Sequence, residues 1–132
     1  MKLDHVSLTV SDRARSAAFY GEHFGLTERV HEDERLLILG GPAEGEPAEG
    51  KPGAGGGAGS LLALSEGPSA AGGLPRTNHF GFRAAGADEV RAARERFRAA
   101  GVEEAEWQDD HGFVRVQVFD PDGYRVELYA LS

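Results

Sequence analysis

Apolar and polar residues alternate with a period of two along several short stretches of the chain, which is the pattern of half-buried β-strands. The clearest stretch is residues 113–129, FVRVQVFDPDGYRVELY, in which Val114, Val116 and Val118 share one face. The central DPDG has the composition of a tight turn, because aspartate favours its first position, proline its second and glycine its fourth. We therefore expect a β-hairpin, with Glu127 on the polar face of its second strand.

The same periodicities predict further strands and two helices. The strands are expected at residues 3–10, 27–31, 35–39, 60–65, 78–84 and 102–108. Ser11 or Asp12 can cap a helix that runs to about Phe24, and Asp88 can cap a second helix that runs to about Ala100. Their apolar faces are expected to hold Ala14, Ala17, Ala18, Gly21 and Phe24 in the first helix, and Val90, Ala93, Phe97 and Ala100 in the second.

Residues 40–59, GGPAEGEPAEGKPGAGGGAG, interrupt these patterns, since they contain no large apolar residue. Such a segment buries too little surface to order itself, so a flexible surface loop is predicted, with a lid over a pocket as the alternative. A phosphate-binding loop is not expected, because GxxxxGK[ST] between a strand and a helix is absent. A shorter flexible link is predicted at residues 66–75.

The two halves of the chain repeat each other. DHVSLTV at residues 4–10 matches NHFGFRA at residues 78–84, and the strand at residues 35–39 matches residues 115–119. The offset between matched strands falls from 80 to 64 across residues 40–59, as expected if a hairpin loop of 20 residues stands where the second half has a four-residue turn. We predict an α+β fold of two βαβββ modules, residues 1–66 and 76–132, with one helix covering one face of each sheet.

The uncovered face of the predicted sheets is polar. It carries His5, Ser7, His79, Arg83, Arg115, Gln117, Arg125 and Glu127. On an open, flat sheet such a face is merely solvated. If two sheets curl beside each other, the same residues instead line a concave polar cleft.

The composition narrows the class of protein. The 132 residues suit one domain, and the absence of cysteine excludes disulfides, cysteine zinc sites and thiol nucleophiles. It also fits a reducing cytoplasm, which is the predicted location. The net charge of -8 argues against nucleic-acid binding and favours a small-molecule ligand. A membrane span and a signal peptide are not expected, because no apolar run is long enough and the first ten residues resemble a strand.

The motifs DHVSLTVSD with AAFYGEHFGL, NHFGFRA and DPDGYRVELY resemble those of the vicinal oxygen chelate superfamily. This group includes glyoxalase I, fosfomycin-resistance proteins, extradiol dioxygenases and bleomycin-resistance proteins. The resemblance covers essentially the whole chain and implies a single domain, residues 1–132, of curved mixed sheets around a concave cleft. Single-domain relatives imply a homodimer, in which the cleft often joins modules from two subunits.

The resemblance also implies a metal site. Metal-bearing members take ligands from the first and last strands of each module, and the matching positions here are His5, His79 and Glu127, with Ala63 in the fourth place. Ala63 cannot coordinate a metal, which counts against glyoxalase I. Two histidines and one carboxylate resemble the ligand set of extradiol dioxygenases and fosfomycin-resistance transferases. Such a set leaves positions open for substrate oxygens on one divalent ion, which could be Fe, Mn, Zn or Ni.

The chain departs from these relatives at two positions. Gln117 stands where both kinds of enzyme have tyrosine, and Arg115 stands where the fosfomycin enzymes have serine, whereas Ser7 matches their small hydroxyl residue. These three are candidate catalytic residues. Candidate substrate contacts are Ser7, Arg83, Trp107, Arg115, Gln117 and Tyr129. The two arginines among them suit an anionic substrate group, and His111, before the hairpin, could be a mobile acid or base.

Two classes of function follow from these observations. The first is a small metalloenzyme that catalyses ring cleavage with O2, thiol addition or isomerisation by proton transfer. The alternative is a non-catalytic protein of the bleomycin-resistance type, which shelters an antibiotic or metabolite in the same cleft.

Overall fold

The computed structural model describes residues 1–41 and 59–131. Residues 42–58, which make up most of the predicted glycine-rich loop, lie outside the described residues, so both the loop and the lid alternative stay predictions. The chain divides into two compact units, Met1–Ser69 and Ala70–Ser132.

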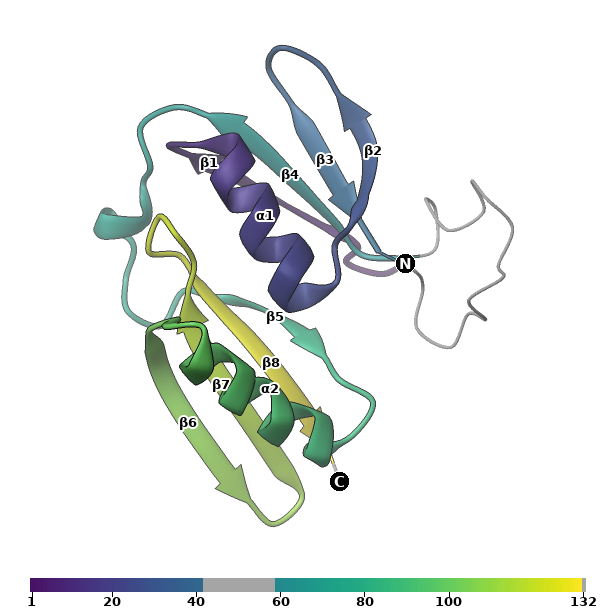
Figure 1. Cartoon of the computed structure of the whole chain (residues 1–132), viewed down its shortest axis with the longest axis vertical. Helices are drawn as coiled ribbons and strands as arrows, with labels where there is room; N and C mark the ends of the chain where they lie inside the picture. Colours follow the sequence, from purple (N-terminus) through teal and green to yellow (C-terminus); the bar gives the residue numbers. More distant parts are fainter. Residues whose placement is uncertain (42–58, 132) are drawn as a thin grey trace. The chain divides into compact units, whose positions relative to one another are not determined.

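Within its described residues, the first unit is a four-stranded sheet with one helix (Figure 1). Its elements are β1 (His5–Val10), α1 (Arg13–Phe24), β2 (Glu28–Glu32), β3 (Leu37–Gly40) and β4 (Leu61–Glu66). The strand order is β1-β4-β3-β2, in which β1 and β4 are parallel and the other neighbours antiparallel.

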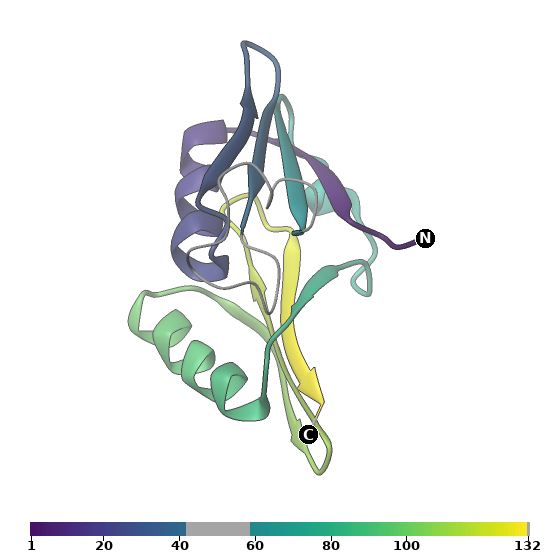
Figure 2. The same ribbon diagram turned by 90° about the vertical axis from the view of Figure 1, so that its right-hand side faces the viewer.

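The second unit repeats this arrangement after a short 3-10 helix, η2 (Ala71–Gly73). Its elements are β5 (Phe80–Arg83), α2 (Ala87–Ala99), β6 (Glu104–Asp110), β7 (Phe113–Phe119) and β8 (Arg125–Leu131). The strand order β5-β8-β7-β6 has the same parallel and antiparallel pairs as the first sheet, and α2 lies along one face (Figure 2). The predicted α+β fold of two βαβββ modules is confirmed. The module boundaries and the single-domain organisation stay predictions.

The strand registers identify equivalent positions in the two units. Ser7 pairs with Ala63 in the first sheet, and Gly81 pairs with Glu127 in the second. Ala63 therefore occupies the place of Glu127, as the repeat predicts. One sheet presents a carboxylate there and the other presents only a methyl group.

The helix ends follow general capping rules. α1 begins as expected, because the Asp12 side chain accepts a hydrogen bond from the Arg15 amide at 3.1 Å, and it ends at Gly25, whose φ is 72°. The expected cap of α2 is wrong. Gly86 is the N-cap, and Asp88 lies in the first turn, where its charge complements the helix dipole.

The buried face of α1 also differs from the prediction. Ser16, Ala17 and Tyr20 are buried, whereas Ala14 and Ala18 are exposed. The large Tyr20 ring is fully buried and fixes which side of the helix faces the sheet. In α2 the predicted Val90, Ala93 and Phe97 are buried, while Ala100 is exposed beyond the end of the helix.

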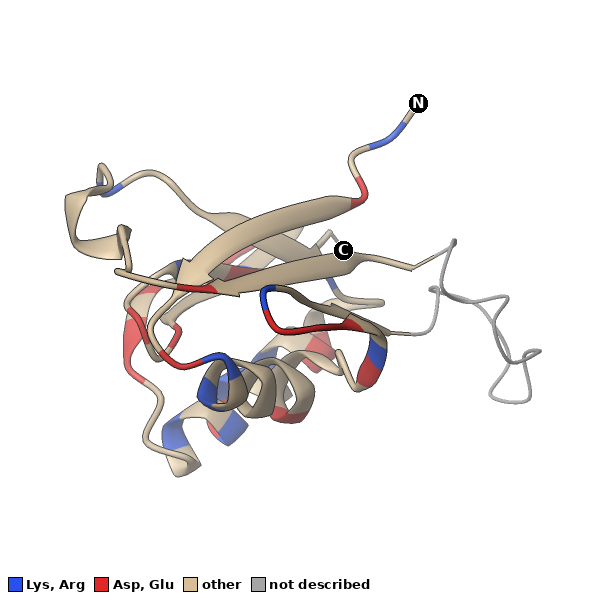
Figure 3. Ribbon diagram, turned by 90° about the horizontal axis from the view of Figure 1, so that it is seen from above, with Lys and Arg blue, Asp and Glu red and all other residues tan. Residues whose placement is uncertain are grey.

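Two ion pairs join α2 to β6 beside this apolar face. Arg91 Nε donates to Asp109 Oδ2 at 2.9 Å, and Arg94 Nε donates to Glu104 Oε1 at 2.7 Å. The Arg94 guanidinium also lies over the Trp107 ring, 4.3 Å from its centre. Both acidic and basic residues occur along the helices (Figure 3), and in α2 two of the arginines fasten the helix to the sheet edge. No helix in residues 1–41 or 59–131 is long and apolar enough to cross a membrane.

The hydrogen bonds from Arg94 lower the pKa of Glu104 below its ordinary value of 4.5. Because folding favours the charged form, this stabilisation is present above the unfolded pKa and is lost as the pH falls through the folded pKa. We predict that Glu104→Gln lowers the free energy of unfolding by about 0.5–1 kcal/mol at pH 7. The difference from wild type should shrink as the pH falls below 4.5.

Urea unfolding at a series of pH values measures this difference. Glu103→Gln, at an exposed neighbouring position, removes the same charge and serves as the control. An equal loss in both variants, or a loss that does not change with pH, would contradict the prediction.

Candidate metal and substrate site

One face of the second sheet carries a polar row that crosses all four strands. Residues paired across neighbouring strands point to the same face, and the pairing places Gly81, Glu127, Gln117 and Glu106 side by side. The next residues along β7 and β8 are apolar and buried, on the face covered by α2. The polar row therefore lies on the face opposite the helix.

Glu127 is the buried centre of this row, with 9% of its surface exposed. Gln117 Nε2 donates to its Oε1 atom at 3.0 Å, and Arg115 Nη1 donates to the same atom at 3.2 Å. His79 Nε2 lies 3.7 Å from this oxygen. A buried carboxylate is costly unless its charge and hydrogen bonds are matched, and Arg115 supplies the opposite charge.

His79 lies directly before β5, and its ring is oriented by the backbone. Its Nδ1 atom is 2.9 Å from the carbonyl oxygen of Thr77. A carbonyl can only accept, so Nδ1 carries a proton, and Nε2, which faces Glu127, is the ring nitrogen that could bind a metal. Histidine ligands of metals are commonly held in this way.

Gln117 connects Glu127 to Arg125, which lies two residues earlier on β8. Its side chain is fully buried, and its Oε1 atom accepts a hydrogen bond from Arg125 Nη1 at 3.2 Å. Glu106 completes the network, with carboxylate oxygens 3.6 Å from Arg125 Nη1 and 3.7 Å from Arg115 Nη2. We call these five residues the Glu127 cluster. Among the described residues, no buried side-chain nitrogen or oxygen lacks a hydrogen-bond partner.

A cavity of about 340 Å³ opens over the Glu127 cluster. Its lining consists of Arg76, Thr77, His79, Glu106, Arg115, Gln117 and Arg125, all in the second unit. A cavity of this volume accommodates a small organic molecule. Its polar walls would orient such a molecule next to His79 and Glu127.

Gly81 makes room for the Glu127 side chain. A Cβ atom at this position would stand 3.1 Å from Glu127 Cβ and 3.2 Å from the Glu127 carbonyl oxygen. Both distances are shorter than ordinary van der Waals contact, so glycine permits the close approach of β5 to this residue.

The structure places the two site residues predicted in the first unit on β1. His5 is exposed, and its Nδ1 atom lies 2.9 Å from Asp4 Oδ1; this contact lowers the pKa of Asp4. Ser7 is also exposed. Among the described residues, no group of three or more histidine, aspartate or glutamate side chains is placed to hold a metal ion. The contribution of His5 to a site with His79 and Glu127 stays a prediction.

Three predicted substrate contacts of the second unit lie outside the cavity lining. Arg83 is exposed and pairs with Tyr129, one row further along the polar face, where the Tyr129 ring stacks on Phe113. Trp107 lies beneath Arg94, on the face covered by α2. Their role as substrate contacts stays a prediction.

Three charged residues of the cavity wall, and Thr77, were not among the site residues predicted from the sequence. Arg125 falls on the predicted polar face, and Arg76 lies in the link before β5, where no periodic pattern exists. Glu106 is displaced by an irregularity in β6 between residues 104 and 106, which turns both Glu104 and Trp107 toward the helix. The charge of these three residues, on or beside a polar face, is the sequence feature that could have identified them as site residues.

The family model described as the Glyoxalase/Bleomycin resistance protein/Dioxygenase superfamily matches residues 2–128. The chain belongs to this superfamily. The resemblance drawn from the sequence motifs is therefore confirmed. Comparison with curated proteins gave no significant match.

Solved structures of this fold include the fosfomycin resistance protein FosX from Listeria monocytogenes, which is 23% identical over 100% of this chain and 94% of that chain, with a TM-score of 0.72. A lactoylglutathione lyase from Agrobacterium tumefaciens is 23% identical over 98% of this chain and 92% of that chain, with a TM-score of 0.66. A possible glyoxalase from Bacillus cereus is 22% identical over 97% of each chain, with a TM-score of 0.70. At such identities the likeness shows the fold. One FosX structure holds Mn(II) and a sulfate ion.

The close fit at Gly81 can be tested by adding a single methyl group. We predict that Gly81→Ala lowers the free energy of unfolding by about 1–2 kcal/mol, because the new Cβ presses on the backbone and side chain of Glu127. Gly72→Ala is the matched control, since a Cβ at Gly72 meets nothing within 4 Å. Denaturant unfolding of both variants checks the prediction, and an equal stability of the two would contradict it.

Proposed function

We propose that this protein is a small metal-dependent enzyme, in which His79 and Glu127, together with His5, hold one divalent ion beside a small-molecule substrate. The observation that carries the proposal is the pair formed by His79 Nε2 and Glu127 Oε1, which lie 3.7 Å apart, with His79 in the lining of the cavity. Membership of a superfamily in which FosX binds Mn(II) supports it.

The residues of the second unit fit such an ion by their chemistry. A neutral imidazole nitrogen and a carboxylate oxygen are donors for Fe, Mn, Zn or Ni, and the Thr77 carbonyl already holds the imidazole in the required tautomer. When bound, the ion would polarise a substrate oxygen as a Lewis acid. The third donor, His5, would come from the first unit of the same chain or of a partner in the predicted homodimer.

The other residues of the cluster would act on the carboxylate and on the substrate. Gln117 and Arg115 hold Glu127 Oε1 in place, and the fully buried Gln117 also excludes water from that side. Arg115 would contact an oxygen of the substrate in the cavity. Ring cleavage, thiol addition and isomerisation remain the candidate reactions, and a cytoplasmic homodimer remains the proposed form of the protein.

One observation favours a second candidate, a non-catalytic protein that sequesters its ligand. The Glu127 carboxylate already has its charge matched by Arg115 at 3.2 Å, so the cluster is satisfied without an ion. A binding protein of this kind would retain its ligand with no dependence on metal.

Metal titration separates the two candidates. We predict that the chelator-treated wild type binds one Mn(II) per chain in calorimetry, and that His79→Ala or Glu127→Gln weakens binding tenfold or more, because each removes a donor. His111→Ala removes an exposed histidine of the same unit and should leave binding unchanged. Absence of binding in the wild type, or equal binding in all variants, would reject the metalloenzyme.

Arg115 should compete with the ion for Glu127. We predict that Arg115→Met raises the affinity for Mn(II) several-fold, because it removes a positive charge 3.2 Å from the carboxylate oxygen. The same change should lower the stability of the metal-free protein by roughly 3 kcal/mol, because the buried carboxylate loses its partner. Calorimetry and urea unfolding measure the two effects. Arg96→Met, on the exposed side of α2, is the control for loss of charge, and a fall in affinity with Arg115→Met would contradict the competition.

A further inference from the structure

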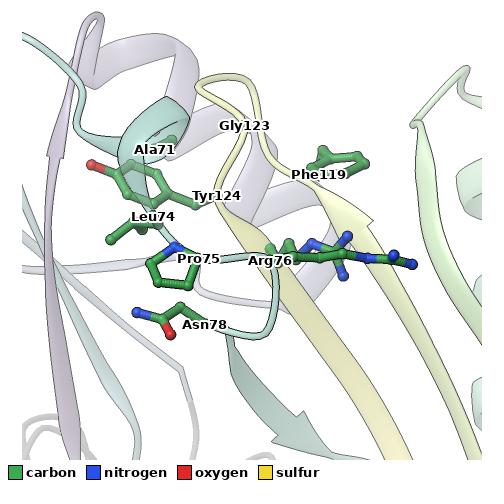
Figure 4. A pocket seen from close by; sticks show the side chains of 9 residues that line it. Ala71, Leu74, Pro75, Arg76, Asn78, Phe119, Gly123 and Tyr124 are labelled. Carbon is green, nitrogen blue, oxygen red and sulfur yellow. The ribbon is translucent and has the colours of Figure 1, made fainter.

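A second cavity of about 230 Å³ adjoins the one over the Glu127 cluster. It lies between the link that precedes β5 and the turn that joins β7 to β8 (Figure 4). Arg76 and Arg125 belong to the lining of both cavities. A ligand bound between these arginines could therefore extend from one cavity into the other.

The smaller cavity has an apolar wall. Leu74, Pro75, Phe119 and Tyr124 surround it (Figure 4). Tyr124 is buried, and its hydroxyl accepts a hydrogen bond from the Ala70 amide at 3.3 Å, which fixes the ring. Leu74 remains 43% exposed. An apolar side chain left open beside a rigid ring is a surface that an apolar part of a ligand would cover.

The arginine end of the cavity is polar and positive. Arg125 is held from three sides by Gln117, by Glu106 and by the Phe119 ring, whose centre is 5.4 Å from its guanidinium carbon. Arg76 differs, because within residues 1–41 and 59–131 no hydrogen bond or ion pair engages its side chain. A fixed guanidinium beside an uncommitted one can bind an oxyanion through charge-assisted hydrogen bonds.

The charge balance around the two cavities supports an anionic ligand. Arg115 is matched by Glu127 at 3.2 Å, and Arg125 faces Glu106 at 3.6 Å, so the charge of Arg76 is in excess. This excess occurs in a chain whose net charge is -8. An anion is thus attracted to this part of the surface although the protein as a whole repels it.

We propose that Arg76 and Arg125 bind the anionic head of a small organic acid, whose apolar body packs on Leu74, Pro75, Phe119 and Tyr124. The inference names the ligand class of the site in "Proposed function" and rests on it for the reacting end of the ligand. Binding of the acid itself requires no metal. The uncommitted Arg76 is the residue on which selection of an anion depends.

Benzoate and benzamide test the proposal, because they share an aromatic ring and differ in charge. Both are titrated into the chelator-treated full chain, and amide chemical shifts are followed by NMR. We expect saturable amide shifts at Leu74, at residues 76–78 and at Tyr124 with benzoate, and binding of benzamide about tenfold weaker. Equal binding of the two probes, or no saturable shift with benzoate, would overturn the proposal.

Variants assign the selectivity to the residues named. Arg76→Ala should weaken benzoate about tenfold and leave benzamide unchanged, whereas Arg76→Lys should keep part of the preference. Leu74→Ala should weaken both probes, because it removes apolar contact from the shared ring. Arg96→Ala removes an arginine from the exposed side of α2 and should change neither. Unchanged benzoate binding in Arg76→Ala would overturn the proposal.

The outcome is separable from that of the metal site. If Mn(II) binds in a His79-dependent way while Arg76→Ala leaves benzoate binding intact, the anion site fails and the metalloenzyme stands. If benzoate binding depends on Arg76 but no Mn(II) binds, the anion site stands and the metalloenzyme fails.

Discussion

The second unit is built around a buried carboxylate whose hydrogen bonds come from neighbouring side chains. Glu127 lies in the middle of β8, and its Oε1 atom meets donors from two residues of β7 and faces an imidazole from the start of β5. These contacts exist only in one strand register. A slip of one residue would turn Glu127 onto the face that α2 covers and would expose apolar side chains on the other. The strand register that buries the apolar face is therefore also the register that gives Glu127 its hydrogen-bond donors.

The network around this carboxylate limits what can happen in the cavity. Arg115, Gln117 and Arg125 are each engaged with a neighbour on the sheet, so a bound ion or substrate meets groups that are already held in position. Groups already fixed in position lose little freedom when a ligand arrives, which favours specificity. A cation and an anion would also affect each other's binding, because both act on charges that the cluster shares.

Most of the fold could be predicted from the sequence because its signals are local. The alternation in β7 and β8 and the turn between them depend on residues close in the chain, and the internal repeat then supplies the topology of the other half. The errors have physical causes. Alanines carry little information about which side of α1 is buried, whereas the single large Tyr20 decides it. The irregularity in β6 changes which residues alternate between the two faces, so the sequence pattern does not predict that Glu106 lies on the polar face. Of the candidate site, His79 and Glu127 lie together in the second unit, and the contribution of His5 stays a prediction.

The equivalence of Ala63 and Glu127 has a consequence for the superfamily as a whole. Backbone hydrogen bonds hold both positions in the same register, and they are indifferent to the side chain that the strand carries there. A duplicated module can thus acquire or lose a reactive group by a single substitution while its scaffold persists. The strand order can then persist while the side chains on one face of the sheet change. Relatives with superimposable backbones can therefore perform unrelated reactions.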